Sequence, residues 1–324
     1  MNKNNLKKIA KNVIDLEIQA LRKLKNSINN TFNKVVNLIV NCQSKVIFCG
    51  VGKSFIIASK ISSTLSSVGS PSFAISASQC THGDLGSITK KDLLILISNS
   101  GETDELKPVI QYAKRNKITL VGIVSKKNSV LYKSSDYKLY IPEMKESGHG
   151  IVPTSSTTSQ LALGDALAIA SMNYKNFGKL DFKKFHPSGT LATKLKTVED
   201  LMIKGNKIPF IDENSSMKNA LKILSKKNLG VLIVRNKNRK TIGVVTDGDL
   251  KRAIAENNEI KNIKLKKIMS KNPISINQNE LAVKALTLMT SKKKITSLCV
   301  YKNEKKNQTV GLIHIHNILN ANIN

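Results

Sequence analysis

Three segments of the sequence combine glycine, hydroxyl and charged residues in patterns that suit the binding of a phosphate group. The first is Gly50–Ser54, which reads Gly-Val-Gly-Lys-Ser and directly follows an apolar run. Free backbone N–H groups at a glycine-rich turn that opens a helix bind anions well. The segment is neither a Walker A loop nor a dinucleotide fingerprint, because it lacks the first glycine of the former and has Phe55 at the third glycine position of the latter. A tight turn with a solvated lysine is the alternative for this segment taken alone.

The second segment, residues 98–103, reads Ser-Asn-Ser-Gly-Glu-Thr and again lies between an apolar run and a helical pattern. Ser98, Ser100 and Thr103 supply hydroxyl groups, and Gly101 lets the backbone approach an anion closely. A capped helix start is the alternative. Two such turns at successive strand ends favour a ligand site, because open α/β sheets bind ligands at the carboxyl ends of their strands.

The third segment, residues 153–158, reads Pro-Thr-Ser-Ser-Thr-Thr and precedes an apolar helical pattern at residues 161–172. A low-complexity linker is the alternative. The strongly apolar pattern that follows favours a buried helix whose N-terminus faces a ligand.

The elements that position these segments form two different patterns along the chain. Residues 5–40 carry apolar side chains every three to four positions, which predicts a long amphipathic helical region with a stripe suited to subunit packing. Beyond it, apolar runs alternate with helical patterns, which predicts a parallel sheet covered on both faces. The runs are residues 45–49, 72–75, 92–98, 119–124 and 138–141, and the helical patterns are 53–68, 103–116 and 128–134.

The second half of the chain contains an internal repeat with an offset of 65 to 68 residues. Three segments of the first copy (residues 198–202, 217–226 and 241–254) resemble three of the second (266–269, 282–291 and 309–319). The repeating unit is βαββα-like, and two copies are expected to pack face to face because each leaves one apolar face uncovered.

The composition excludes several functional classes. The formal charge is +30, with 28 basic and 12 acidic residues before position 198 and 24 and 10 after it, so no basic tail or patch stands out. Only five of the 52 basic residues are Arg and aromatic residues are 4%, which disfavours a nucleic-acid partner. We expect neither a zinc site from the four scattered cysteines nor a membrane span, so the expected location is cytoplasmic.

Taken together, the motifs resemble those of arabinose 5-phosphate isomerases. The three segments above, Thr81–Gly86 (Thr-His-Gly-Asp-Leu-Gly) and His186–Gly189 (His-Pro-Ser-Gly) occur in the order found in that family, which has a sugar isomerase (SIS) domain followed by two cystathionine-β-synthase (CBS) modules. The resemblance implies an α/β fold, with a three-layer, parallel-sheet SIS domain of Rossmann or flavodoxin type and then a tandem CBS pair. The expected divisions are an N-terminal helical region at 1–44, the remaining SIS domain at 45–197, and CBS modules at 198–258 and 266–324.

The resemblance also implies an activity, the interconversion of D-ribulose 5-phosphate and D-arabinose 5-phosphate through an enediol, for the Kdo branch of lipopolysaccharide synthesis. By position, the family's catalytic residues correspond to Lys53, Glu105, Glu146 and His186. Either glutamate could be the C1/C2 base, with Glu102 a less favoured alternative to Glu105. The expected substrate-binding residues are Ser54, His82, Ser98, Ser100, Thr103, Thr154, Ser155 and Ser156.

Further expectations concern cofactors and partners. No cofactor is expected, and a metal is not expected because Ser76 stands where relatives have a His to which metal binding is attributed. Thr246 and Asp249 match the Thr-x-x-Asp pattern with which CBS modules bind nucleotides, whereas the second copy has His314 and Asn317 at these positions. A nucleotide or sugar-nucleotide effector and a purely structural, dimerising role are both open. The family is tetrameric, so a homo-oligomer is expected, and the alternative function is a non-catalytic SIS–CBS sensor of sugar phosphates.

Overall fold

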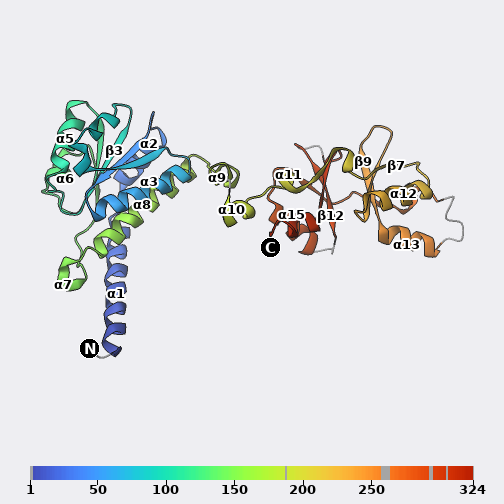
Figure 1. Ribbon diagram of the computed structural model, residues 1–324, viewed down its shortest axis with the longest axis horizontal. Helices are drawn as coiled ribbons and strands as arrows, with labels where there is room; N and C mark the ends of the chain where they lie inside the picture. Colours follow the sequence, from blue (N-terminus) through green and yellow to red (C-terminus); the bar gives the residue numbers. More distant parts are fainter. Residues whose placement is uncertain (1–2, 187, 257–262, 292–294, 304–305, 324) are drawn as a thin grey trace. The chain divides into compact units, whose positions relative to one another are not determined.

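A computed structural model describes residues 3–186, 188–256, 263–291, 295–303 and 306–323. It divides into two compact units, Met1–Phe185 and His186–Asn324, which are treated separately below (Figure 1). In the described part of the chain, no helix is both long and apolar enough to cross a membrane.

The first unit is built on a parallel sheet in the order β2-β1-β3-β4-β5. The strands are β1 (Val46–Gly50), β2 (Ser72–Ser76), β3 (Leu93–Ser98), β4 (Thr119–Val124) and β5 (Tyr137–Tyr140). Each of the five apolar runs therefore forms a strand, as the sequence predicts. The order reverses between β1 and β3, which is the flavodoxin-type arrangement.

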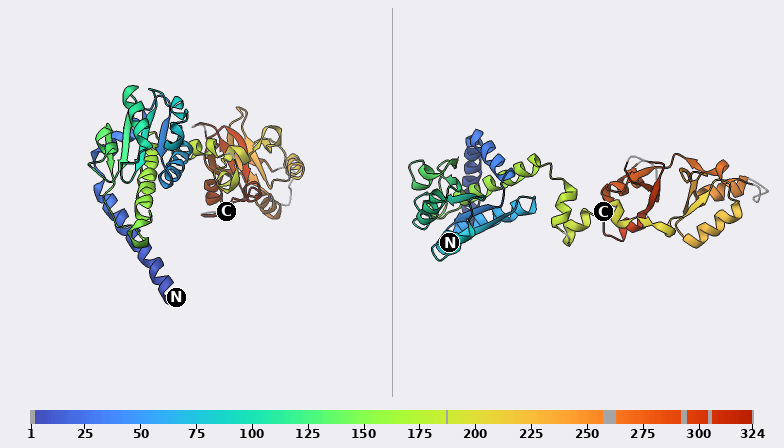
Figure 2. Two further views of the ribbon diagram at one scale, coloured as in Figure 1. Left: turned by 60° about the vertical axis from the view of Figure 1, so that its left-hand side comes forward. Right: turned by 90° about the horizontal axis from the view of Figure 1, so that it is seen from above.

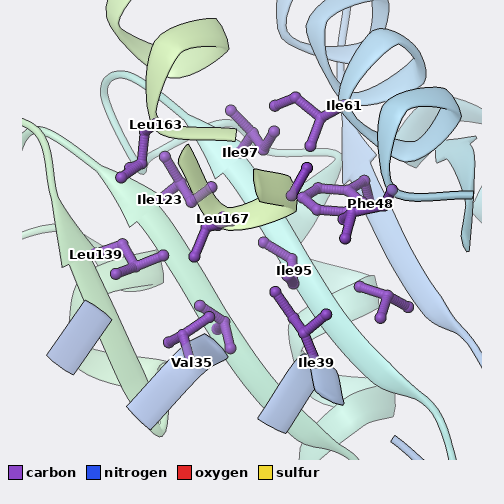
Figure 3. Close-up of a cluster of buried hydrophobic side chains, with 14 of the residues drawn as sticks. Val35, Ile39, Phe48, Ile61, Ile95, Ile97, Ile123, Leu139, Leu163 and Leu167 are labelled. Atoms are coloured by element: carbon purple, nitrogen blue, oxygen red, sulfur yellow. The ribbon is translucent and has the colours of Figure 1, made fainter. Parts of the chain in front are cut away.

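Alternate residues along the strands face two separate cores, as expected for strands covered on both sides. On one face lie α2 (Asn30–Val40), α3 (Lys53–Ser67) and α8 (Ser155–Tyr174), whose side chains pack with Phe48, Ile95 and Ile123 of the sheet (Figure 3). On the other face lie α4 (Ala77–Cys80), α5 (Leu106–Arg115) and α6 (Val130–Ser134), which pack with residues such as Ile47 and Leu96. The remaining elements are η1 (Asp84–Ser87), α7 (Gly148–Ile151) and α9 (Lys179–Phe185).

The predicted N-terminal helical region consists of two helices. Helix α1 spans Lys3–Ser27 and α2 begins at Asn30. The chain breaks here because Asn29 is the N-cap of α2 and its side chain accepts a hydrogen bond from Thr31 N–H (2.9 Å). The N-terminal half of α1 extends away from the sheet (Figure 2).

The second unit contains the predicted repeat. The first copy comprises α11 (Val198–Leu201), β6 (Ile203–Lys204), η2 (Gly205–Lys207), β7 (Phe210–Asp212), α12 (Met217–Lys227), β8 (Val231–Arg235), β9 (Thr241–Thr246) and α13 (Asp247–Glu256). The second comprises α14 (Leu265–Ile268), β10 (Ser270–Lys271), β11 (Ser275–Asn277), α15 (Ala282–Ser291), β12 (Ser297–Tyr301), β13 (Thr309–His314) and α16 (Ile315–Leu319). Helix α10 (Gly189–Lys194) precedes both copies.

Each copy gives one short strand to the other's sheet. The orders are β10-β9-β8-β7 and β11-β12-β13-β6, so β6 and β10 each pair with a strand of the opposite copy. Between the sheets a shared core holds Ile208, Val231 and Ile233 from one copy and Cys299 and Leu312 from the other. The exchange ties the two repeats into one unit, as their uncovered apolar faces require.

Candidate functional site

The carboxyl ends of β2, β1 and β3 lie side by side because these strands are neighbours in parallel register. Gly50 pairs with Ser76, and Cys49 pairs with both Ile75 and Leu96. Helix α3 follows β1 on one face of the sheet and α5 follows β3 on the other, so the two connections diverge from the point where the strand order reverses. In open α/β sheets this point is where ligands bind.

The turn after β1 places Lys53 at the start of α3. Gly52 has φ +54°, which favours glycine, and a Cβ at Gly50 would lie 3.0 Å from the backbone of Ser54. Both glycines are thus required by the turn itself. Lys53 is exposed, Ser54 is half-buried, and the Lys53 ammonium has no hydrogen bond or ion pair with any residue that the structure describes. An unpaired cation at a helix N-terminus is well suited to attract a phosphate or an oxyanion.

The loop after β3 is held by its own hydroxyl groups. Ser98 is buried, its Oγ accepts a hydrogen bond from Gly101 N–H (2.9 Å), and it lies 2.9 Å from Thr103 Oγ1. Ser100 is exposed, and its Oγ accepts a hydrogen bond from Glu102 N–H (3.2 Å). This network fixes the loop in a closed turn at the sheet edge.

Two residues of this loop that the sequence did not mark as binding groups connect it to the next strand. Glu102 accepts a hydrogen bond from Val130 N–H (2.9 Å), and Asn99 Oδ1 accepts one from Ser125 Oγ (2.7 Å). Both partners follow β4, so the hydroxyl loop is braced by its neighbour in the sheet. The Glu102 carboxylate therefore has a hydrogen-bond partner within the fold, whereas the Glu105 carboxylate has none among the described residues. Only the tertiary fold brings these partners together, so no local pattern could have identified them.

Gly101 allows the loop to pack this closely, and its replacement is expected to destabilise the protein. It has φ +68°, and an added Cβ would collide with the Ser129 side chain and lie 2.7 Å from Val124 Cγ2. We expect Gly101→Ala to lower the free energy of unfolding by about 1–3 kcal/mol, as overpacking does. Urea denaturation measures the change. Gly178→Ala is the matched control, because its φ is ordinary and its nearest contact would be 4.0 Å away; equal stabilities of the two variants would contradict the expectation.

Helices α3 and α8 run side by side in the same direction. Near their middles Lys60 forms an ion pair with Asp165, and near their ends Lys175 Nζ donates hydrogen bonds to Gly69 O (3.0 Å) and Ser70 Oγ (2.9 Å). The bonded residues of the two helices are separated by nearly the same number of positions in the sequence near the middle and near the end of the pair. Both helices therefore begin at the same edge of the unit. Their packing is close, since a Cβ at Gly164 would overlap Ile61. The third hydroxyl segment therefore lies on the same side of the sheet as Lys53.

Glu146 binds the N-terminus of α8. Its carboxylate accepts hydrogen bonds from Thr154 N–H (2.8 Å), Thr154 Oγ1 (3.3 Å) and Ser156 N–H (3.3 Å). A carboxylate is stabilised here by the free N–H groups and by the helix dipole. Glu146 thus occupies the anion position that the pattern of the third segment predicts for a ligand.

Buried hydroxyl groups beside this carboxylate have no partner. Ser155 is fully buried and Ser147 nearly so, and neither Oγ makes a hydrogen bond with a residue that the structure describes. Since buried polar groups are normally hydrogen-bonded, these two indicate a place where a polar ligand or water completes the site. Ser156 is also buried, and Thr154 is half-buried.

The segment between Glu146 and α8 forms a short exposed loop. Ser147 and Val152 pair across its base, and Gly148, His149 and Gly150 at its tip all have positive φ. His149 is thus a non-glycine residue in the left-handed region, which costs energy and is more common at functional sites than elsewhere.

The remaining predicted residues of the SIS domain, Glu105, His82 and His186, differ in their exposure and in the segment of the chain to which they belong. Glu105 is exposed at the N-cap of α5, and its carboxylate has no hydrogen bond or ion pair with a described residue. His82 is exposed in the turn after β2, between α4 and η1, so it lies at the same edge. His186 is half-buried and is the first residue of the second unit.

In the second unit, Thr246 and Asp249 form a local pair at the start of α13. The Asp249 carboxylate accepts hydrogen bonds from Thr246 N–H (2.8 Å) and Thr246 Oγ1 (2.7 Å), and also pairs with Arg252. Both residues line a cavity of about 430 Å³ that includes Ser270–Ile274 from the second copy. At the equivalent positions, His314 caps α16 with its own ring nitrogen and Asn317 carries no charge.

Comparisons with known proteins agree with this architecture. A model of the SIS domain matches residues 39–170, and a model of the CBS domain matches residues 198–256 and 265–324. The chain is 36% identical over 315 residues to the arabinose 5-phosphate isomerase KdsD of Yersinia pestis, covering 97% of this chain and 95% of the relative. It is 39% identical over 309 residues to the KdsD of Francisella tularensis, covering 94% and 93%.

A solved structure from E. coli CFT073, a complex with arabinose 5-phosphate, is also similar. It has 37% sequence identity and a TM-score of 0.56, and the match covers 58% of this chain and all of that one. Because the relatives match over nearly their full length, this chain, which joins a SIS domain to two CBS domains, belongs to the arabinose 5-phosphate isomerase family.

Proposed function

We propose that this protein interconverts D-arabinose 5-phosphate and D-ribulose 5-phosphate as an aldose–ketose isomerase. The observation that carries the proposal is the placement of Lys53, the Ser98–Thr103 loop, Glu105 and the N-terminus of α8 at one edge of the SIS sheet. The sequence identity of 36% and 39% to KdsD isomerases, which extends over nearly the full length of the chain, supports the same activity and substrate.

The substrate phosphate would lie at the divergence of the turns after β1 and β3. Ser54, Ser98, Ser100 and Thr103 supply hydroxyl groups there, and the first turn of α3 supplies N–H groups and the positive end of the helix dipole. The ordered Ser98–Thr103 network costs little to arrange on binding, because it is closed before the ligand arrives.

The chemistry requires a base, a stabilising cation and an acid–base group for the sugar oxygens. A carboxylate removes the proton from C1 of the ketose or C2 of the aldose, and the electron pair moves into an enediolate whose oxyanion Lys53 stabilises. Return of the proton to the other carbon completes the isomerisation. His186 and His82 are our candidates for opening the sugar ring and moving protons between its oxygens.

The two glutamates are assigned different roles on the basis of their contacts. Glu105 is exposed and its carboxylate has no described partner, so it is available to take a carbon-bound proton. Glu146 already accepts hydrogen bonds from Thr154 and Ser156. We therefore assign Glu105 as the base and Glu146 as a positioning residue that orients α8 and its buried serines.

The test is to incubate the purified full-length protein with ribulose 5-phosphate in deuterium oxide and to follow the products by NMR. We expect arabinose 5-phosphate to form, with deuterium entering at the carbon that is protonated. The reaction needs no metal in our proposal, so treatment with EDTA should leave the rate unchanged. A non-catalytic sensor is the second candidate, and it would bind the sugar phosphate without any exchange. It is disfavoured because a sensor needs only the phosphate loops, whereas Lys53 and both glutamates are retained.

We further propose that the enzyme works as a homo-oligomer, a tetramer by family resemblance, in the cytoplasm, and that it supplies the Kdo branch of lipopolysaccharide synthesis. Leu6, Ile9 and Ile14 on the projecting half of α1 are exposed, which supports burial of this helix against other copies of the chain.

A nucleotide or sugar nucleotide is the proposed effector at the cavity of Thr246 and Asp249, with a purely structural role of the CBS pair as the alternative.

A further inference from the structure

A second cavity in the CBS pair lies apart from the one lined by Thr246 and Asp249. It has a volume of about 630 Å³, which is in the range of small-molecule sites. Phe210, Lys226, Lys227 and Arg235 from the first copy line it, together with Thr309 from the second. We call it the Arg235 cavity. Because residues of both copies contribute, a ligand here would contact the two CBS modules at once.

The lining of the Arg235 cavity is strongly positive. Of its described lining residues, three are cationic and none is Asp or Glu. Lys227 is held in place by a hydrogen bond from its ammonium group to Asn206 O, whereas Lys226 is exposed. None of the three cations forms an ion pair with a carboxylate of the described residues.

Arg235 is half-buried and has few partners among the described residues. Its guanidinium lies over the Phe210 ring, with Cζ 3.0 Å from the ring centroid, and Nη2 donates a hydrogen bond to Thr309 O (3.0 Å). The buried Nε has no hydrogen-bond partner among the described residues. A guanidinium has five N–H donors, and one side chain–backbone bond is recorded here, so most of its binding capacity is unused. Arg235 as a whole is half-buried, but leaving its Nε donor buried without a hydrogen bond is costly, and a bound anion would offset that cost.

We propose that the Arg235 cavity binds a small phosphate-bearing anion, at a site separate from the catalytic edge and from the cavity of Thr246. The planar guanidinium, fixed on Phe210, suits two-point recognition of a phosphate group. Lys226 and Lys227, adjacent on the last turn of α12, add charge for a second phosphate. This inference does not rest on the isomerase activity, because every residue it uses lies in the CBS pair.

The probe is pyrophosphate, titrated into the full-length protein by calorimetry and compared with inorganic phosphate. We expect Arg235→Gln and Lys226→Gln each to weaken pyrophosphate binding about tenfold, as loss of one charge-assisted contact does. Lys222→Gln is the matched control, because Lys222 is exposed on the same helix but does not line the cavity. It should leave the affinity unchanged.

Hydrogen exchange locates the bound anion. Pyrophosphate is expected to slow exchange in residues 205–212 and 226–235. Protection confined to residues 98–103 or 246–249 would place the anion at one of the other two sites and overturn the proposal. If Arg235→Gln, Lys226→Gln and Lys222→Gln weaken pyrophosphate binding equally, an adventitious ion only is held by the general positive charge of the protein. The same conclusion follows if Arg235→Gln leaves the affinity for pyrophosphate unchanged. If Arg235→Gln does not fold, Lys226→Gln still tests the proposal, because the Lys226 side chain is exposed and its replacement does not disturb the core.

Discussion

Lys53→Met is expected to lower kcat by about 100-fold or more while leaving the fold and the substrate KM little changed. The reason is that the ammonium group has no described partner in the protein, so its charge is available for an oxyanion that exists only along the reaction path. The Ser98–Thr103 loop, which would hold the substrate phosphate, does not depend on Lys53 for any of its hydrogen bonds.

The measurement is the initial rate of ribulose 5-phosphate formation from arabinose 5-phosphate, with thermal unfolding as the test of structure. Lys90→Met is the matched control, since Lys90 is also an exposed lysine but precedes β3 at the opposite edge of the sheet. If Lys53→Met keeps a rate close to that of the unchanged protein, Lys53 has no role in the chemistry. A rise in KM with unchanged kcat would instead make it a substrate-binding residue.

Glu105→Gln and Glu146→Gln are expected to fail in different ways. Removing the base should lower kcat by about 10²–10⁴-fold and stop deuterium exchange at C1 and C2, with no loss of stability because the Glu105 side chain has no described partner. Glu146→Gln removes a negative charge from the N-terminus of α8, so it should lower the free energy of unfolding by about 1 kcal/mol.

Deuterium exchange separates the two roles. In Glu146→Gln, turnover should fall but each turnover should still exchange its proton, because the base is intact. Glu143→Gln is the control, since Glu143 is exposed on the same connection. Loss of exchange in Glu146→Gln with retention in Glu105→Gln would reverse the assignment and make Glu146 the base.

Much of the fold follows from the sequence because the apolar patterns are local. The apolar runs that form β1 to β5 are continuous, as strands buried on both faces must be, and the repeat in the second half is visible as direct self-similarity. The one break that the periodicity hid lies between α1 and α2. It depends on the capping preference of Asn29, which leaves the spacing of the apolar residues unchanged.

The motifs of the candidate site were also visible in the sequence, but their partners were not. Gly50–Ser54 and the Ser98–Thr103 segment could be recognised because glycines and hydroxyl groups at strand ends form a short, contiguous pattern. The same kind of pattern before α8 suggested a ligand at that helix N-terminus. In the structure, Glu146 accepts hydrogen bonds there instead.

The sequence by itself determined the family, the parallel sheet, the tandem repeat and the residue types at the strand ends. Each of these features depends on residues that are contiguous or regularly spaced in the chain. Tertiary structure alone decided which of these groups are free to react. The contacts of Glu102 with Val130 and of Arg235 with Phe210 and Thr309 join positions that are distant in sequence, and the contact of Glu146 with the start of α8 closes the loop between these two segments. A hydrogen bond or a buried polar atom without a partner depends on distances that only the packed chain defines, so no spacing rule could have revealed them.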